Sequence, residues 1–212
     1  MTATFPDRAA AGRALAARLT HYADRSDVVV LGLPRGGVPV AAEVAAALHA
    51  PLDVYVVRKL GVPGRDELAL GAIGPGGVRV LNDDVVRSYR IDVVDIDRVV
   101  ERETAELERR QREYRGDAGA IDVAGRVVIL VDDGLATGAT MRAAVKAVQQ
   151  SDPSRVVVAV PVAARAVCAD LASLADEVVC VHTPEMFMAV GQWYDDFSQT
   201  SDAEVRDCLS RR

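Results

Sequence analysis

The sequence predicts an α/β fold: a parallel sheet with helices on both faces, followed by a small C-terminal hood. Short apolar runs alternate with segments in which apolar residues recur at helical spacing. The runs are continuous rather than alternating, which is typical of parallel strands buried on both faces. We expect a core over residues 1–182 and a hood over residues 183–212.

Five apolar runs are the expected strands of this core. They lie at residues 27–33, 52–57, 126–131, 155–163 and 177–181. Helical spacing appears between them at Leu15, Leu19 and Tyr22, at Val40, Val44 and Leu48, at Met141, Ala144, Val145 and Val148, and at Val167, Leu171 and Leu174. Strands and helices therefore alternate through most of the chain.

The alternation is interrupted between residues 60 and 115. Residues 61–77 read GVPGRDELALGAIGPGG, which is too rich in turn formers to be one regular element. Within and after it, residues 69–73 and 78–81 are expected to pair as a small hairpin. A polar helix is then predicted over residues 97–115, either solvated over the sheet or in contact with a second copy of the chain.

Composition excludes several classes of protein. The 212 residues suffice for one α/β domain, and the formal net charge of −6 argues against a non-specific nucleic-acid binder. No apolar run approaches the length of a membrane span, and the first residues do not resemble a signal peptide. Cys168, Cys180 and Cys208 match neither a zinc spacing nor a disulfide framework. We expect a cytoplasmic protein with reduced cysteines and no membrane or nucleic-acid partner.

The stretch VVILVDDGLATGAT, residues 127–140, combines a buried strand with groups suited to a ligand. Asp132 and Asp133 follow the strand, and carboxylates there can accept hydrogen bonds from the hydroxyls of a ribose. The next residues supply backbone N–H groups, two hydroxyls and a helix N-terminus, which together suit a phosphate. They are Ala136, Thr137, Gly138, Ala139 and Thr140. The alternative interpretation is structural: a turn at Asp133 and a helix cap at Thr140.

A second loop, LPRGGVP at residues 33–39, has the composition of an anion-binding loop. Gly36 and Gly37 leave backbone N–H groups accessible, and Arg35 adds a positive charge. The glycine spacing of a dinucleotide-binding fingerprint is absent, as is the Gly-Lys-Ser/Thr sequence of an NTPase phosphate loop. The expected ligand is therefore a phosphate compound bound in another way.

The 127–140 stretch resembles the signature of the type I phosphoribosyltransferases, which is an apolar strand, two acidic residues and a Thr-Gly-x-Thr phosphate loop. The resemblance extends over about residues 27–182. It implies that Asp132 and Asp133 hold the ribose hydroxyls of phosphoribosyl pyrophosphate (PRPP). Residues 136–140 would then bind its 5-phosphate. Gly134 departs from the family, in which many members carry an aliphatic residue at this position.

The same resemblance assigns roles to residues nearer the N-terminus. Residues 33–39 correspond to the pyrophosphate loop, which often contains a non-proline cis peptide, here expected at Pro34–Arg35. Arg58 and Lys59, placed at the end of the second strand, correspond to basic residues that meet pyrophosphate, and Lys59 joins the two aspartates as a candidate catalytic residue. Residues 60–77 correspond to a mobile catalytic loop, whose charges are Arg65, Asp66 and Glu67.

The segments LGLPRGG, VRKLGVPG and DFSQTSDAEV also resemble those of bacterial phosphoribosyltransferase-domain proteins. The function implied is transfer of ribose 5-phosphate from PRPP to a nucleobase-like or other nitrogenous acceptor, with release of pyrophosphate. Mg²⁺ would be carried by PRPP near Asp132 and Asp133, without a direct protein site, and a homodimer is expected. The alternatives are a non-catalytic PRPP or nucleotide sensor and an unrelated nucleotide-binding α/β protein such as a methyltransferase.

Aromatic residues concentrate in the hood. Phe187, Trp193, Tyr194 and Phe197 lie within twelve residues of one another, although aromatic residues make up 4% of the chain. One interpretation is a surface, including Trp193, that stacks a planar acceptor. The other is a small satellite core beneath the terminal segment.

Overall fold

The computed structural model describes residues 4–116 and 118–210. Its main sheet has five strands in the order β2-β1-β6-β7-β8, and every neighbouring pair is parallel. The strands are β1 (Val28–Gly32), β2 (Leu52–Val54), β6 (Val127–Val131), β7 (Arg155–Val162) and β8 (Glu177–His182). The structure confirms the predicted α/β class, and four of the five predicted strands agree closely in their bounds.

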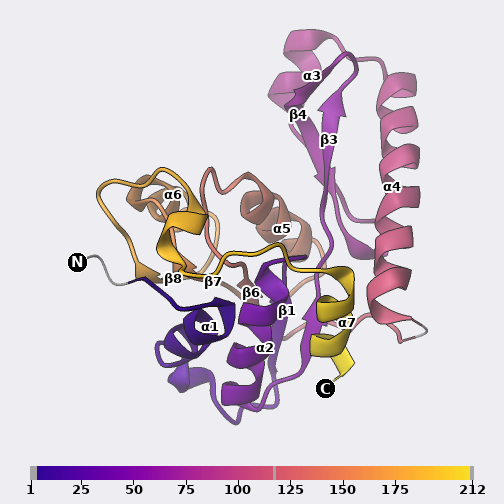
Figure 1. The fold of residues 1–212 in the computed structure, drawn as a ribbon. Helices are drawn as coiled ribbons and strands as arrows, with labels where there is room; N and C mark the ends of the chain where they lie inside the picture. Colours follow the sequence, from indigo (N-terminus) through magenta and orange to yellow (C-terminus); the bar gives the residue numbers. More distant parts are fainter. Residues whose placement is uncertain (1–3, 117, 211–212) are drawn as a thin grey trace.

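Helices cover both faces of this sheet (Figure 1). One face carries α1 (Arg8–Ala16), α2 (Gly37–Leu48) and α7 (Asp202–Ser210), and the other carries α5 (Ala139–Gln149) and α6 (Arg165–Leu171). Within β6, Val127 and Ile129 pack toward the first face, whereas Val128 and Leu130 pack toward the second. Because both faces are buried, the central strands β1 and β6 are apolar throughout.

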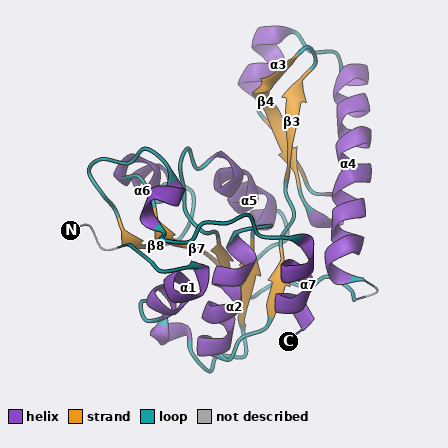
Figure 2. Ribbon diagram, in the orientation of Figure 1, coloured by secondary structure: helices purple, strands orange, loops and turns teal. Residues whose placement is uncertain are grey.

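A second, antiparallel sheet projects from the main body at the top of Figures 1 and 2. It consists of β3 (Arg58–Val62), β4 (Arg65–Ile73) and β5 (Arg79–Leu81), in the order β3-β4-β5. The predicted hairpin is confirmed, because β4 and β5 pair across the 3₁₀ turn η2 (Pro75–Gly77). Most of residues 60–77 is therefore strand rather than irregular loop; that this segment moves stays a prediction.

Two helices follow the second sheet. They are α3 (Asp83–Tyr89) and the long α4 (Val93–Arg115), which begins four residues before the predicted start. The face of α4 that carries Leu107 and Tyr114 is buried within the same chain. This packing accounts for the buried apolar residues of α4 within one chain, whereas Val93 and Val94 at its start are exposed. Dimerisation stays a prediction. No helix in the described part of the chain has the length and apolarity needed to cross a bilayer.

The predicted second strand, residues 52–57, is corrected by the structure. The strand β2 ends at Val54, and Arg58 and Lys59 begin β3 of the second sheet. Tyr55 and Val56 are nevertheless buried, at 5% and 2% exposed, in the connection between the two sheets. An apolar run does not distinguish a strand from a buried connection, which is why the prediction extended the strand too far.

The N-terminal segment and the hood meet beside the main sheet. Backbone hydrogen bonds of 2.8 Å join Phe5 N to Trp193 O and Asp195 N to Phe5 O. Phe5, Trp193 and Tyr194 form a small buried cluster with Val162 of β7. The remaining short helices are η1 (Thr20–Tyr22) and η3 (Val190–Trp193). The hood therefore packs against the N-terminal segment.

Replacing Asp53 with alanine is expected to lower the free energy of unfolding by about 3–5 kcal/mol. The carboxylate of Asp53 is 1% exposed and accepts hydrogen bonds from Arg115 Nε at 2.9 Å, Val54 N at 2.7 Å and Ile121 N at 3.1 Å. Its loss would leave the guanidinium of Arg115, which is 7% exposed, with an uncompensated buried charge. Urea denaturation measures the change. The exposed pair of Arg13 and Glu43 provides the control, since Glu43→Ala should change stability by less than about 1 kcal/mol; equal effects would contradict the prediction.

Candidate functional site

The order of the strands places two loops at one point of the main sheet. The chain passes from β1 to β2 on one side, and β6 then pairs with β1 on its other side. The loops after β1 and β6 therefore leave adjacent carboxyl ends, where the strand order reverses. Ligands of open α/β sheets bind at such switch points.

These two loops are in direct contact through glycines. A Cβ on Gly37 would lie 2.7 Å from Val131 O and 2.8 Å from Asp132 Cα, and a Cβ on Gly36 would overlap Asp133 Oδ2. The peptide bond Pro34–Arg35 is cis, as the family resemblance implied. The glycines thus allow residues 33–39 to approach Asp132 and Asp133 without an intervening side chain.

Asp132 and Asp133, the acidic pair, are half-buried where β6 ends. Asp132 Oδ1 accepts a hydrogen bond from Asp133 N at 2.9 Å, and Asp133 Oδ2 accepts one from Arg8 Nε at 2.9 Å. Burial and then the charge of Asp133 raise the pKa of Asp132 well above its ordinary value. Burial also raises the pKa of Asp133, although Arg8 opposes that increase. Two carboxylates with raised pKa values in one place are typical of a functional site.

The predicted phosphate loop, residues 136–140, leads into α5. Gly138 has φ +70° and immediately precedes the helix, a backbone conformation that favours glycine. Ala136, Thr137, Ala139 and Thr140 are exposed, and Arg142 Nη2 donates to Thr137 O at 2.8 Å. The loop thus presents a helix N-terminus and two exposed threonines to an anion.

Gly134, the departure from the family pattern, has a steric explanation. A Cβ at this position would lie 2.5 Å from Val190 Cγ1 and 3.1 Å from Val162 Cγ1. An aliphatic side chain at this position would collide with η3 of the hood and with Val162, so glycine permits the close packing seen here.

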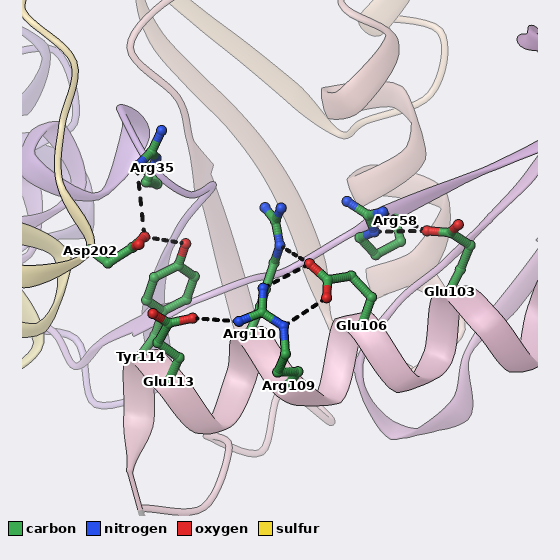
Figure 3. A network of polar contacts seen from close by, with 9 residues as sticks. All are labelled: Arg35, Arg58, Glu103, Glu106, Arg109, Arg110, Glu113, Tyr114 and Asp202. Carbon is green, nitrogen blue, oxygen red and sulfur yellow. Dashed lines mark hydrogen bonds and ion pairs between the residues drawn. The ribbon is translucent and has the colours of Figure 1, made fainter.

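The two predicted arginines of the pyrophosphate site lie beside α4 and α7 (Figure 3). Arg58 Nη2 lies 2.6 Å from Glu103 Oε2, and Arg35 Nη1 lies 3.9 Å from Asp202 Oδ1. A cavity of about 190 Å³ next to Arg35 is lined by Arg35, Arg109, Arg110, Glu113, Tyr114 and Asp202. Three guanidinium groups at one polar cavity suit an anion, although carboxylates compete for them.

The other predicted charges lie on the second sheet. Lys59 is exposed near the start of β3, in register with Ala72 of β4. The guanidinium of Arg65 lies 5.4 Å from the centre of the Tyr89 ring. The side chains of Asp66 and Glu67 lie outside the described residues. Contact of these charges with a ligand stays a prediction.

Trp193 does not present an exposed ring. It is 6% exposed, packs with Phe5 and Val162, and its ring centre lies 6.5 Å from that of His182. Its position favours the satellite-core interpretation over stacking of an acceptor. Tyr194 instead connects the hood to the acidic pair, since its hydroxyl donates to Asp133 O at 2.5 Å.

Arg8 and Tyr194 contact the acidic pair but were not among the predicted site residues. Arg8 lies 125 positions from Asp133 in sequence and precedes the region of family resemblance. No local pattern marks an arginine in the first turn of a helix as a partner for a distant carboxylate. The aromatic cluster was a signal for Tyr194, but it did not indicate which aromatic residue reaches the site.

Comparison with known proteins agrees with this geometry. The family model described as "Phosphoribosyl transferase domain" matches residues 3–197. The chain belongs to this family. The finding confirms the resemblance stated from residues 127–140 and excludes the unrelated nucleotide-binding alternative.

Three relatives place this phosphoribosyl transferase domain among similar proteins. MT0597 and Rv0571c of Mycobacterium tuberculosis are each 54% identical over 207 residues, and both carry provisional names as phosphoribosyl transferases. The match covers 98% of this chain but 46% of each relative, so the chain spans less than half their length. The crystal structure of TT1426 from Thermus thermophilus has a TM-score of 0.89 and 45% identity, covering 98% of both chains.

Proposed function

We propose that the chain transfers the ribose 5-phosphate of PRPP to a nucleobase-like or other nitrogenous acceptor and releases pyrophosphate. The observation that carries this proposal is the meeting of the acidic pair, the phosphate loop and the 33–39 loop at one switch point. A ribose that carries a 5-phosphate and a pyrophosphate needs binding groups of these three kinds.

The acidic pair and the phosphate loop hold the part of PRPP that is transferred. The carboxylates of Asp132 and Asp133 accept hydrogen bonds from the ribose hydroxyls. As the bond from C1 to pyrophosphate breaks, positive charge develops on the ribose ring, and the two negative charges stabilise it. The N–H groups and hydroxyls of residues 136–140 bind the 5-phosphate and fix the position of the ring.

The leaving pyrophosphate is held by groups on the other side of the ribose. In this proposal the 33–39 loop, whose glycines contact the acidic pair, binds pyrophosphate through the backbone N–H of Gly36 and the charge of Arg35. The N–H of Gly37 donates to Leu33 O at 3.1 Å instead. Arg58 and Lys59 supply further positive charge from β3. The electron pair of the broken bond leaves with pyrophosphate, and a ring nitrogen of the acceptor forms the new bond to C1.

Mg²⁺ is the cofactor proposed for this reaction. When bound with PRPP, the ion neutralises charge on the pyrophosphate and orients it. The donors present fit this arrangement, since the oxygens of Asp132 and Asp133 are of the type that Mg²⁺ prefers. Among the described residues, no cluster of three or more His, Cys, Asp or Glu side chains has the arrangement of a metal site. We assign the acidic pair to the ribose hydroxyls and propose that the ion enters with PRPP.

Phosphorus NMR of PRPP, Mg²⁺ and the protein tests the proposal. Pyrophosphate is expected to appear only after pooled purine and pyrimidine bases are added, and dividing the pool then identifies the acceptor. PRPP signals that broaden without turnover in any pool would instead support a PRPP sensor. Signals that neither broaden nor disappear would contradict both functions. A homodimer and a cytoplasmic location stay predictions, and sedimentation analysis tests the first.

A further inference from the structure

Arg8 connects the N-terminal helix to the acidic pair. Its Nε donates to Asp133 Oδ2 at 2.9 Å, and its Nη1 donates to Ser198 O at 2.7 Å. The guanidinium carbon lies 4.1 Å from the centre of the Phe197 ring. The side chains of Arg8 and Asp133 are 13% and 14% exposed. The guanidinium therefore donates hydrogen bonds from two of its nitrogens and stacks one face on an aromatic ring. Because it is mostly buried, solvent screens its charge little.

The N-terminal helix and the hood cooperate in this contact. Asp7 Oδ1 accepts from Ala10 N at 2.7 Å, which caps α1 and determines where Arg8 begins the helix. Ser198 and Phe197 belong to the hood, as does Tyr194, whose hydroxyl holds the backbone oxygen of Asp133. The carboxylate and the carbonyl of Asp133 are thus held by separate elements.

We propose that Arg8 is a positioning residue for PRPP, which fixes the orientation and the negative charge of the Asp133 carboxylate that receives a ribose hydroxyl. This inference rests on the proposed function. Arg8 donates its Nε to Oδ2 at 2.9 Å, and the side chains of Asp133 and Asp132 also interact with each other by hydrogen bonding. In this proposal the other oxygen, Oδ1, receives the ribose hydroxyl.

Because the Asp133 carboxyl is buried, it needs a positively charged partner such as Arg8 to stay ionised. Asp133 faces Asp132, Arg8 and Tyr194, and its own burial raises its pKa, whereas Arg8 lowers it. Asp196 and Glu204 of the hood also lie within the range of the Arg8 charge. Without Arg8, the pKa of Asp133 would rise further, and the carboxyl would be protonated at a higher pH. A protonated carboxyl loses acceptor capacity, so the pH below which PRPP affinity falls should move upward.

Three variants of the full chain separate positioning from folding. Arg8→Gln removes the charge, and Arg8→Lys retains it without the planar fork. Arg13→Gln is the matched control: Arg13 lies on the same helix, is 62% exposed and contacts Glu43 at 3.4 Å. PRPP affinity with Mg²⁺ is measured by calorimetry from pH 5 to 8, and the carboxyl carbon of Asp133 is titrated by NMR without ligand.

Arg8→Gln is expected to weaken PRPP binding about tenfold at pH 6. The pH below which PRPP affinity falls, called the acid limb, should rise by about one pH unit. Arg8→Lys should keep the wild-type acid limb, and Arg13→Gln should match wild type throughout. If Arg8→Gln does not fold, Phe197→Leu replaces it, with an expected loss of about threefold from the missing stacking contact.

The two proposals fail in different ways. If Arg8→Gln binds PRPP with the affinity and the pH dependence of wild type, the role of Arg8 is overturned and the transferase function is left intact. Absence of PRPP binding by wild type would overturn the proposed function. In that case an Asp133 titration unchanged by Arg8→Gln would also overturn the electrostatic role of Arg8, and a titration moved upward would support it.

Discussion

The double substitution of Asp132 and Asp133 by asparagine is expected to weaken PRPP binding at least tenfold and to lower the transfer rate by a larger factor. Asparagine keeps the size of each side chain but removes both negative charges. Hydrogen bonds to charged acceptors contribute about 1.5–3 kcal/mol each, so the loss of two exceeds tenfold in affinity. The rate should fall further, by about 10²–10³, because the charges act most strongly on the cationic ribose of the transition state.

The melting temperature of the double variant provides the control for this prediction. Affinity for PRPP is expected to fall, whereas the melting temperature is not. Both carboxyls have raised pKa values in the folded chain, so folding favours their protonated forms. Such groups stabilise the fold most below their unfolded pKa values, and that stability is lost as pH rises through their folded ones. At a pH above these folded pKa values the ionised pair destabilises the protein. Asparagine removes that cost and keeps an oxygen that can accept from Arg8, so the melting temperature should be equal or higher.

Calorimetry with PRPP and thermal unfolding at pH 7 measure the two effects together. Asp170→Asn on α6 is the matched control, because its side chain is exposed and distant in sequence from the site loops. Affinity equal to wild type in the double variant would show that the pair does not hold the ribose. A large fall in melting temperature would show that the pair is structural instead.

The parts of the site predicted from sequence are those encoded locally. The acidic pair and the phosphate loop follow one another within nine residues, Asp132 to Thr140, and their order reveals strand, ligand groups and helix start together. The strands were recognisable because both faces of the sheet are covered. Burial on both sides makes every position of β6 apolar, as it does for β1.

The parts that were missed depend on contacts between distant segments. Arg8 reaches Asp133 because the N-terminal segment packs against the hood, and nothing near Arg8 in the sequence indicates this. Glu103 and Asp202, the partners of Arg58 and Arg35, likewise appear as ordinary charges on helices. The glycine-rich composition of residues 60–77 suggested a loop, but strands β3 and β4 tolerate these glycines by means of irregular pairing near Gly61 and Val62.

Gly36→Ala is expected to abolish most PRPP binding and to lower transfer about a hundredfold, while the fold is retained. Gly36 has φ −61° and ψ −29°, a conformation open to alanine, so the backbone itself should accept the substitution. The new methyl group would overlap Asp133 Oδ2 and approach Arg8 Nε to 3.2 Å. The carboxylate must then rotate away from Arg8 and from the ribose.

Calorimetry with PRPP and thermal unfolding again separate binding from stability, with Gly119→Ala as control, because a Cβ there would meet no atom within 4 Å. Unchanged affinity in Gly36→Ala would mean that the Asp133 carboxylate can move without consequence, and hence that its position is not used for binding. Loss of affinity at wild-type stability would show the opposite. Gly36 would then leave room for the Asp133 carboxylate, in addition to exposing its own backbone N–H. The loops after β1 and β6, although distant in sequence, would therefore constrain each other at this contact.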